Sequence, residues 1–403
     1  LLLTLVAQAP GQYPALLIAL QLLVFCVAPR ADHLFRMVPP GASAPLAESV
    51  DQLLLETTNR LFGFELDATR APLMQRRLGD GGLGLRRRGG PHAAAAWLAS
   101  WAQCYKAVHA HTSWEFSPTS SVNSSGSLSH LLQRAAEDVR DSGARGAAHF
   151  LDGSTWRSFA REPARGLQRA LRRALETATR DRWWTSAPTD LAALAASSSG
   201  WSAGAALLRP PTERVLQLPD ADVRIAVCER LCVDLSGEGV CGHVSRAGNV
   251  CGHRLRGGAH AHCCGGTAGV RTTQRHNPLA QEFARILSAA GRNVATEQRD
   301  PSMGPNARLD IVEFASDLGG PAAYDVSVVT PLREEASFRE ACATEPGLAA
   351  ERRHTYKLGH QYGQRRPGTV LAPLVVERLA AEDEQDVVGH HARVPRAPLR
   401  RVH

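Results

Sequence analysis

The order of apolar patterns between residues 279 and 376 leaves few folds open to this chain. A helical stripe comes first, with Leu279, Phe283, Ile286, Leu287 and Ala290 at positions i, i+4, i+7, i+8 and i+11. Three strand-like runs follow at 293–297, 308–314 and 324–329, separated by turns rich in proline and glycine. A second helical region, about 333–360, precedes a last strand-like run at 370–376. This order predicts an α+β fold, in which helices flank a small mixed sheet.

The ends of the first helix in this order have recognisable capping residues. Asn277 suits an N-cap, and Pro278 suits the first helical position, where its missing N–H costs nothing. Gly291 suits the C-cap, because glycine adopts the left-handed backbone conformation that ends many helices. We therefore expect the helix to lie between these residues.

Three carboxylates lie on the strand-like runs: Glu297, Asp310 and Asp325. In a meander, neighbouring strands direct alternate residues to one face, so Asp310 and Asp325 can point the same way with Glu297 nearby. Hard cations such as Mg²⁺ bind carboxylate oxygens and keep positions open for water and phosphate. A catalytic Mg²⁺ or Mn²⁺ site is therefore one hypothesis, with Lys357 or Arg308 countering the charge. Taken singly, each such carboxylate is more often a solvated or salt-bridged surface residue, and it is the ordered set that favours a metal site.

A cluster of soft metal ligands precedes this region, with the spacing C-x9-C-x8-H-x3-C. Its members are Cys241, Cys251, His260 and Cys264, and glycines separate them. Three thiolates and one imidazole suit a closed, structural Zn²⁺ site. Other cysteines and histidines nearby are alternative zinc ligands, namely Cys228, Cys232, His243, His253, His262 and Cys263. The alternative is a set of free cysteines and surface histidines in a glycine-rich loop.

The chain is strongly basic, and nearly all of that charge is arginine. Its 403 residues carry a formal net charge of +7, and lysine occurs only at Lys106 and Lys357. Arginine binds phosphate bidentately, which suits nucleic acid, although a GC-rich coding sequence also enriches arginine. Six arginines recur at helical spacing, namely Arg157, Arg161, Arg165, Arg169, Arg172 and Arg173. A helix face that carries them could lie along a phosphate backbone, or it could simply face solvent.

The first hundred residues are predicted to be mostly helical. Apolar helix patterns occupy about 15–28, 46–62 and 93–108, and Pro39-Pro40-Gly41 separates the first two. The apolar run at 15–28 is short for a membrane span, so we favour a core helix over a signal or membrane segment. Residues 79–85 form a glycine-rich turn, which could cradle a phosphate ahead of Arg86, Arg87 and Arg88 or merely join packed elements.

These patterns together suggest five segments. They are a helical region at 1–110, a Ser/Ala/Arg-rich connector with helices at 111–225, a zinc knuckle at 226–275, a mixed α/β domain at 276–380 and a disordered tail at 381–403. Because Leu1 stands where methionine would begin a chain, we expect the sequence to be a fragment. The clustered cysteines suggest a reducing, intracellular compartment.

Several motifs resemble the C-terminal part of non-LTR (LINE-type) retrotransposon reverse transcriptases. The stretch C-G-H-x-L, G-x-H-A-x-C-C-G-G and R-H-N lies at 251–277, followed by Arg308-Leu309-Asp310 and by the run from Tyr324 to Pro331. Residues 28–40, 81–86, 96–101 and 374–377 are similar to other parts of these proteins. The resemblance covers about 25–105 and 240–378. No Tyr/Phe-x-Asp-Asp polymerase motif occurs in the chain.

The resemblance implies a zinc knuckle followed by a restriction-like endonuclease of the PD-(D/E)xK class. Cys241, Cys251, His260 and Cys264 would hold Zn²⁺. Asp310 and Asp325 would hold the catalytic Mg²⁺ or Mn²⁺, with Glu297 as a third ligand and Lys357 as a relocated basic residue. Two departures from the family pattern stand out, since Leu309 replaces the proline of P-D and Ser327 replaces the lysine two residues after Asp325.

Three functions follow as hypotheses. The first is a nuclease module that nicks target DNA and leaves a 3′-hydroxyl to prime reverse transcription. The second is a zinc-containing remnant that binds nucleic acid without cutting it, and the third is a structural zinc domain with a protein partner. The first two imply DNA and element RNA as partners, no membrane and a nuclear location.

Overall fold

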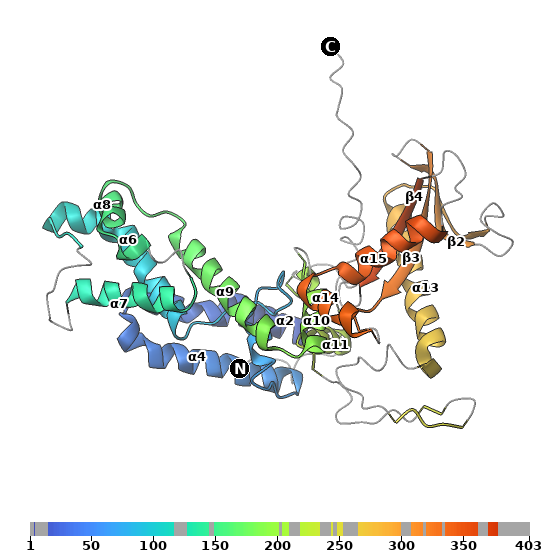
Figure 1. Ribbon diagram of the computed structural model, residues 1–403, viewed down its shortest axis with the longest axis horizontal. Helices are drawn as coiled ribbons and strands as arrows, with labels where there is room; N and C mark the ends of the chain where they lie inside the picture. Colours follow the sequence, from blue (N-terminus) through green and yellow to red (C-terminus); the bar gives the residue numbers. More distant parts are fainter. Residues whose placement is uncertain are drawn as a thin grey trace, which may run out of the picture. The chain divides into compact units, whose positions relative to one another are not determined.

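The chain forms two compact units. The computed structural model describes residues 4, 15–116, 127–144, 149–200, 204–208, 218–233, 243–244, 248–252, 265–299, 308–316, 320–332, 335–361 and 370–377 (Figure 1). The first unit comprises Leu1–Arg77, Leu83–Ala187 and Pro210–Arg224, and the second comprises Leu78–Gly82, Pro188–Arg209 and Ile225–His403. Helices and a mixed four-stranded sheet make up the described residues, so the predicted α+β class is confirmed.

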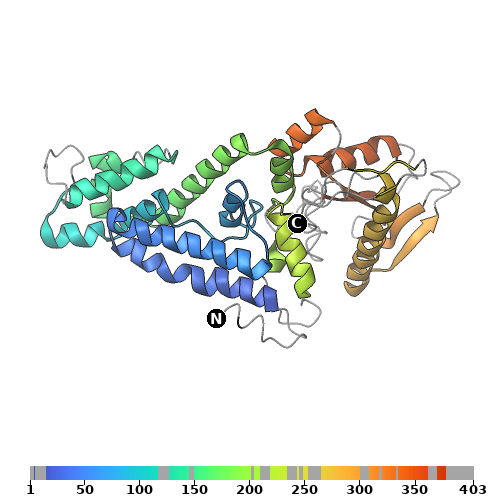
Figure 2. The same cartoon turned by 90° about the horizontal axis from the view of Figure 1, so that it is seen from below.

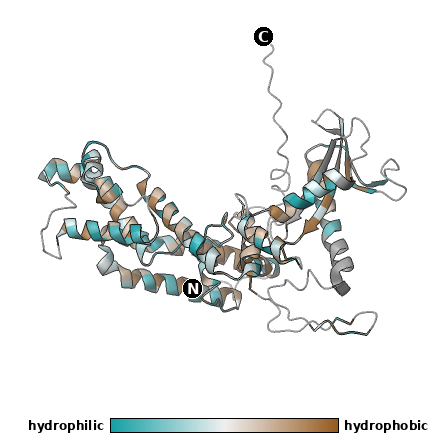
Figure 3. Ribbon diagram, in the orientation of Figure 1, coloured by the Kyte–Doolittle hydropathy of each residue, from teal (hydrophilic) through white to brown (hydrophobic). Residues whose placement is uncertain are grey.

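Helices form the described part of the first unit. They are α2 (Ala15–Leu22), the π-helical η1 (Leu23–Val27), the 3-10 helix η2 (Ala28–Ala31), α3 (Asp32–Met37), α4 (Pro40–Phe62), α5 (Ala71–Gln75), α6 (Pro91–Thr112), α7 (Leu128–Asp141), α8 (Gly153–Arg161) and α9 (Leu167–Ser186). The three predicted N-terminal helices are present, and Pro40 and Pro91 open α4 and α6, where proline needs no hydrogen-bond acceptor. Figure 3 shows hydrophobic and hydrophilic residues mixed along these helices.

An aromatic core holds α6, α7, α8 and α9 together. Tyr105 and Trp156 lie at its centre, with ring centroids 5.1 Å apart in an edge-to-face arrangement. The Tyr105 hydroxyl accepts the N–H of Phe116 at 2.9 Å, and the Trp156 indole donates to the Phe150 carbonyl at 2.8 Å. These bonds satisfy the polar atoms of Tyr105 and Trp156, whereas the buried indole nitrogen of Trp97 in the same cluster has no hydrogen-bond partner. Residues on both sides of the boundary expected near residue 110 therefore share one core.

Residues 15–37 form a helical stretch with a largely apolar sequence. Leu17, Leu20 and Leu23 are buried in the first unit, whereas Phe25 and Met37 are exposed. By length and composition, it is the one described stretch that could cross a membrane, a test that core helices and signal sequences also meet.

Of the six arginines that recur at helical spacing, five lie on two different helices and Arg165 lies between the helices. Arg157 and Arg161 lie on α8, while Arg169, Arg172 and Arg173 lie on α9. The chain turns between the helices, and Gly166 has a φ of +73°, in the left-handed region. A single arginine stripe is therefore wrong, because the periodicity runs across this turn.

One four-stranded sheet organises the second unit, with strand order β1-β2-β3-β4. The strands are β1 (Val294–Arg299), β2 (Arg308–Ser316), β3 (Gly320–Val329) and β4 (Val370–Glu377). The first three are antiparallel and β4 is parallel to β3. The crossover to β4 contains α14 (Ala336–Thr344), α15 (Leu348–Tyr356) and the π-helical η7 (Lys357–Gln361). The predicted order of helices and strands is confirmed, with strand ends within a few residues.

Helices pack against this sheet through apolar side chains. The helix α13 (Gly265–Ala289) contacts β1, β2 and β3, and α15 contacts β3 and β4 (Figures 1 and 2). Phe283 and Leu287 of α13 pack with Ile311 and Val326 of the sheet. The unit also contains α10 (Thr189–Ser197), which packs against α14, the 3-10 helix η4 (Ala205–Leu207) and the end of α11 (Asp220–Arg230).

The predicted start of α13 is wrong, whereas its predicted end is confirmed. The helix begins at Gly265 and continues through Asn277 and Pro278. Proline has no N–H, so the helix lacks one backbone hydrogen bond at Pro278. Residues 265–277 contain no further proline that would interrupt the helix. At the other end, Gly291 has a φ of +79° and its N–H bonds to the Ser288 carbonyl at 2.9 Å. This is a C-cap that suits glycine.

The glycine-rich turn that begins at Gly79 packs within the second unit, to which Leu78–Gly82 belongs. Its carbonyls bind the Arg230 guanidinium, whose Nη2 donates to Leu78 O at 2.5 Å and to Gly82 O at 3.1 Å. A Cβ atom at Gly81 would lie 2.7 Å from the Ala195 carbonyl oxygen, so the close approach requires glycine there. Because its carbonyls point to a cation, this turn is not arranged to hold a phosphate.

Candidate active site

Asp310 and Asp325 lie opposite each other on neighbouring strands. Ile311 pairs with Tyr324 in the antiparallel ladder, and Asp310 and Asp325 are the next residue along each strand. Directly opposed residues place their side chains on the same face of the sheet, with Cβ atoms about 5 Å apart. Each side chain is 17% exposed, and the charge of Asp310 acts on the Asp325 carboxyl group. The strand order therefore brings together two acidic groups that lie far apart in an extended chain.

The Asp310 carboxylate is held by groups from two further positions. Its Oδ2 accepts the backbone N–H of Val326 at 2.7 Å and lies 3.0 Å from Nε2 of His276. Both partners bind the same oxygen, Oδ2. His276 comes from α13, so a helix, as well as the two strands, contributes to the site.

Lys357 supplies the positive charge of the site. It lies at the start of η7 and is 2% exposed. Its ammonium group is 2.6 Å from Oδ1 of Asp325 and donates to the carbonyl oxygens of Asp325 and Val326, both at 3.2 Å. These acceptors match the three hydrogens of an ammonium group, so Lys357 is fully hydrogen-bonded.

Burial and charge shift the pKa values of the three ionisable groups. Burial raises the pKa of Asp325, and the neighbouring Asp310 raises it further. The positive charge of Lys357 lowers this pKa but does not outweigh the effect of burial. Burial likewise lowers the pKa of Lys357, although Asp325 opposes that shift. For His276, burial disfavours the imidazolium, but the contacts with Asn277 and Asp310 outweigh it and raise the pKa.

The structure does not bring Glu297 to the two aspartates. Its side chain is 66% exposed, and its Oε2 lies 3.2 Å from Nη1 of Arg308. Glu297 lies between the paired residues Thr296 and Gln298, at the register position opposite Asp310, and its φ is +52°, in the left-handed region. Its carboxylate nevertheless pairs with Arg308 at the exposed surface, and strand alternation alone did not anticipate this backbone conformation.

Sequence reasoning missed His276 as a candidate site residue. It lies in the R-H-N motif, but the predicted helix began one residue later and left His276 outside it. With α13 extended upstream, His276 precedes Ala280 and Phe283 by four and seven residues. That spacing puts His276 on the helical stripe that packs on the sheet, and it is the signal that could have found it.

Most of the predicted zinc ligands lie outside the described residues, namely Cys241, His260 and Cys264. Cys251 is described and partly exposed, and its N–H bonds to the His243 carbonyl at 2.8 Å. Val244 and Val250 pair beside it as an isolated antiparallel bridge. Of the alternative ligands, Cys228 and Cys232 are buried in the second unit.

The donor set of the site suits a hard divalent cation. Two opposed carboxylates repel each other when both are ionised, and a cation between them removes that repulsion. No cluster of three or more Cys, His, Asp or Glu side chains with metal-site geometry occurs in the part of the chain that is described. A cation here would therefore bind two carboxylates and complete its shell with water and phosphate oxygens, as Mg²⁺ commonly does.

The arrangement combines two carboxylates, a buried ammonium and a histidine, all fixed by the sheet and its flanking helices. Comparison of the sequence with protein-family models and with curated proteins finds no match.

Proposed function

We propose that residues 276–380 form a restriction-like endonuclease domain that nicks DNA with Mg²⁺ or Mn²⁺. The observation that supports this proposal best is the placement of Asp310 opposite Asp325, with the Lys357 ammonium 2.6 Å from Asp325. Ser327 stands where a nuclease of this class would have its lysine. The buried ammonium of Lys357 reaches the same carboxylate from η7 and compensates for that replacement.

Each residue has a distinct role in the proposed reaction. Asp310 and Asp325 bind the cation through their carboxylates. Val326 N–H and His276 orient Asp310, while Lys357 orients Asp325 and offsets part of the negative charge of the pair. A cation held by these two carboxylates would supply activation of water and stabilisation of the charge on the phosphodiester. Cleavage of one strand would leave the 3′-hydroxyl needed to prime reverse transcription.

The remaining parts of the proposal concern the partners. Cys241, Cys251, His260 and Cys264 hold a structural Zn²⁺ ahead of the nuclease domain. The arginine-rich chain binds DNA and element RNA, as part of a non-LTR retrotransposon protein that acts in the nucleus. The basic charge of the chain and the resemblance of its motifs support these assignments.

Nicking of supercoiled plasmid in the presence of Mg²⁺ or Mn²⁺ tests the nuclease. We expect the wild-type chain to produce open circles. Asp310→Ala and Asp325→Ala should reduce the rate about a hundred-fold or more, because the cation contributes several kcal/mol of transition-state stabilisation. Glu340→Gln removes an exposed carboxylate of α14 and is the matched control. Wild-type cutting no faster than that of the two aspartate variants would rule out the nuclease.

The same variants, tested for both nicking and DNA binding, distinguish the nuclease from the alternative function, a remnant that binds nucleic acid without cutting it. A catalytically decayed remnant would bind plasmid DNA in a salt-dependent way in the wild type and in both aspartate variants, with no nicking by any of them. The replacement of the usual lysine by Ser327 is the observation that favours this alternative.

Elemental analysis tests the zinc site separately. Protein purified without chelators should contain about one Zn²⁺ per chain, and Cys241→Ser combined with Cys264→Ser should lose it. Protein that contains no zinc in either form would remove the zinc knuckle and leave the nuclease proposal standing.

A further inference from the structure

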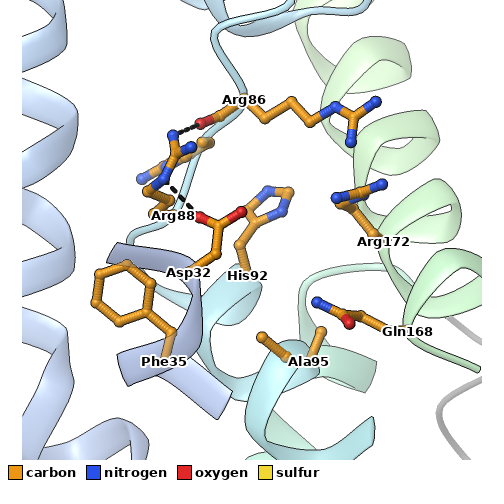
Figure 4. A pocket seen from close by; sticks show the side chains of 10 residues that line it. Asp32, Phe35, Arg86, Arg88, His92, Ala95, Gln168 and Arg172 are labelled. Carbon is orange, nitrogen blue, oxygen red and sulfur yellow. Dashed lines mark hydrogen bonds and ion pairs between the residues drawn. The ribbon is translucent and has the colours of Figure 1, made fainter. Parts of the chain in front are cut away.

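The first unit contains a small cavity lined by arginines, and it shares no residue with the candidate active site. Its volume is about 50 Å³, enough for about three to five water-sized groups at roughly 10–15 Å³ each. It lies among α3, α6, α9 and the segment before α6, and its lining residues are Asp32, Phe35, Arg86, Arg87, Arg88, His92, Ala95, Ala96, Gln168 and Arg172 (Figure 4). We call it the arginine pocket.

The charges of the arginine pocket are not balanced by its own residues. Four guanidinium groups face one carboxylate, that of Asp32, so the lining has an excess of three positive charges. Asp32 forms an ion pair with Arg88, in which the Arg88 Nε lies 2.9 Å from the Asp32 Oδ1. Among the described residues, no carboxylate forms an ion pair with Arg86 or Arg87.

Arg172 is only weakly neutralised by the protein. Its Nε is 3.7 Å from Glu176 Oε1, and Glu176 is shared with Arg77. Figure 4 shows the guanidinium groups of Arg86 and Arg172 turned toward each other. Burial lowers the pKa of Arg172, and the charge of Arg86 lowers it further. Like charges held together in this way indicate a place for an anion.

His92 adds an unused polar atom to the arginine pocket. Its Nδ1 is buried and has no hydrogen-bond partner, which is uncommon for a buried side-chain nitrogen. Burial lowers the pKa of His92 to about 4, with further contributions from Arg87, Arg172 and Arg182. The ring is therefore neutral near pH 7, and a neutral imidazole can donate one N–H.

The protein fixes the walls of the pocket before any ligand arrives. Asp51 of α4 accepts the N–H of Arg88 at 2.9 Å and the N–H of Gly89 at 2.8 Å, which anchors the segment that carries the arginines. The first turn of α6 begins at Pro91, directly after the segment that carries these arginines. The positive end of this helix dipole adds to the field of the guanidinium groups.

We propose that the arginine pocket binds one phosphate group through Arg86, Arg87 and Arg172, with His92 and Gln168 as neutral hydrogen-bond donors. Guanidinium forks match phosphate oxygens in geometry and charge. The phosphate can belong to free inorganic phosphate or to the end or backbone of a nucleic-acid strand. The site is independent of the nuclease proposal, because none of its residues belongs to the candidate active site.

Phosphate binding to the full chain tests this proposal. In wild-type protein, inorganic phosphate should raise the melting temperature and give a saturable calorimetric titration, compared with chloride at equal ionic strength. Arg86→Gln and Arg172→Gln should each weaken binding about ten-fold or more, because a charge-assisted hydrogen bond is lost. Arg180→Gln, an exposed position on α9 with the same charge change, is the matched control and should bind like wild type.

The variants also distinguish loss of binding from loss of folding. In phosphate-free buffer, Arg86→Gln and Arg172→Gln relieve like-charge repulsion, so they should melt at or above the wild-type temperature while losing the phosphate-dependent rise. Equal phosphate binding by wild type and both variants, or no binding by wild type, would overturn the proposal. If phosphate binds, 5′-phosphorylated and 5′-hydroxyl oligonucleotides of one sequence identify the source, because a terminal phosphate would bind only in the first.

Discussion

Each carboxylate of the candidate active site has one oxygen held by the protein. Val326 and His276 bind Oδ2 of Asp310, and Lys357 binds Oδ1 of Asp325. The remaining oxygens belong to two groups that repel each other once both are ionised. At the scale of residues, the protein therefore orients both carboxylates, and a cation between them would remove their mutual repulsion.

Lys357→Met removes the ammonium and keeps a side chain of similar length. Asp325 then loses its counter-charge in a largely buried position, so the free energy of unfolding of the second unit should fall by about 3 kcal/mol. Hydrogen exchange of the β3 amides measures this loss, because these amides report the stability of the sheet. The double variant Lys357→Met/Asp325→Asn should recover part of it. A double variant no more stable than Lys357→Met would show that the ion pair is not the cause.

Cation binding should become tighter as pH rises through the acidic range. The pKa of Asp325 is raised, so at low pH a proton occupies the carboxyl group that the cation needs, and binding must release it. Titration with Mg²⁺ in two buffers of different ionisation enthalpy measures the released proton. Asp325→Asn should bind weakly and without this proton release. Mg²⁺ affinity that stays constant with pH would contradict the assignment.

His92 makes stability depend on pH in the first unit. Its pKa falls from the ordinary 6.5 to about 4 in the folded chain. Between these values the unfolded chain binds the extra proton, so stability decreases as pH falls from 6.5 toward 4, by about 3 kcal/mol at most. His92→Gln should flatten this dependence in phosphate-free buffer, measured by calorimetric melting between pH 4 and 7. An unchanged pH profile in the variant would contradict the buried, neutral His92.

At the scale of elements, the periodicity of apolar residues predicted the helices and strands of the second unit well. It did not predict local changes of backbone conformation. The four strands and the helices of the crossover follow from apolar patterns and turn residues, and with them the pairing of β2 with β3. Glu297 could not be placed in this way, because its positive φ is not encoded in strand alternation. Lys357 was in the predicted helical region, but its approach to Asp325 depends on how α15 and η7 pack on β3 and β4.

Gly291→Ala tests the C-cap of α13. The φ of +79° is strained for alanine, and no atom lies within 4 Å of the added Cβ, so strain alone should cost about 1 kcal/mol. Gly291→Asn should cost less, since asparagine tolerates this conformation better. Gly359→Ala in η7 also adds a Cβ in open space, at an ordinary φ, and serves as the control. Hydrogen exchange of the α13 amides measures each effect, and equal losses for both alanine variants would exclude strain.

At the scale of the whole molecule, each proposed site lies within one compact unit. The arginine pocket uses residues of the first unit, and Asp310, Asp325, Lys357 and His276 belong to the second. Sequence patterns identified helices in residues 1–110 and 111–225, but they did not show that Tyr105 and Trp156 share a core. Periodicity reports which face of a helix is buried, whereas the choice of partner depends on side-chain fit.

Because the two sites share no residue or hydrogen-bond partner, their effects should be additive. Effects of substitutions at distant sites usually add to within about 0.5 kcal/mol. We expect Arg172→Gln to lose phosphate binding with unchanged Mg²⁺ affinity, and Asp325→Asn to lose Mg²⁺ affinity with unchanged phosphate binding. The double variant should show both losses with the magnitudes of the single variants, measured by titration of each ligand. A loss of Mg²⁺ affinity in Arg172→Gln would contradict the independence of the two sites.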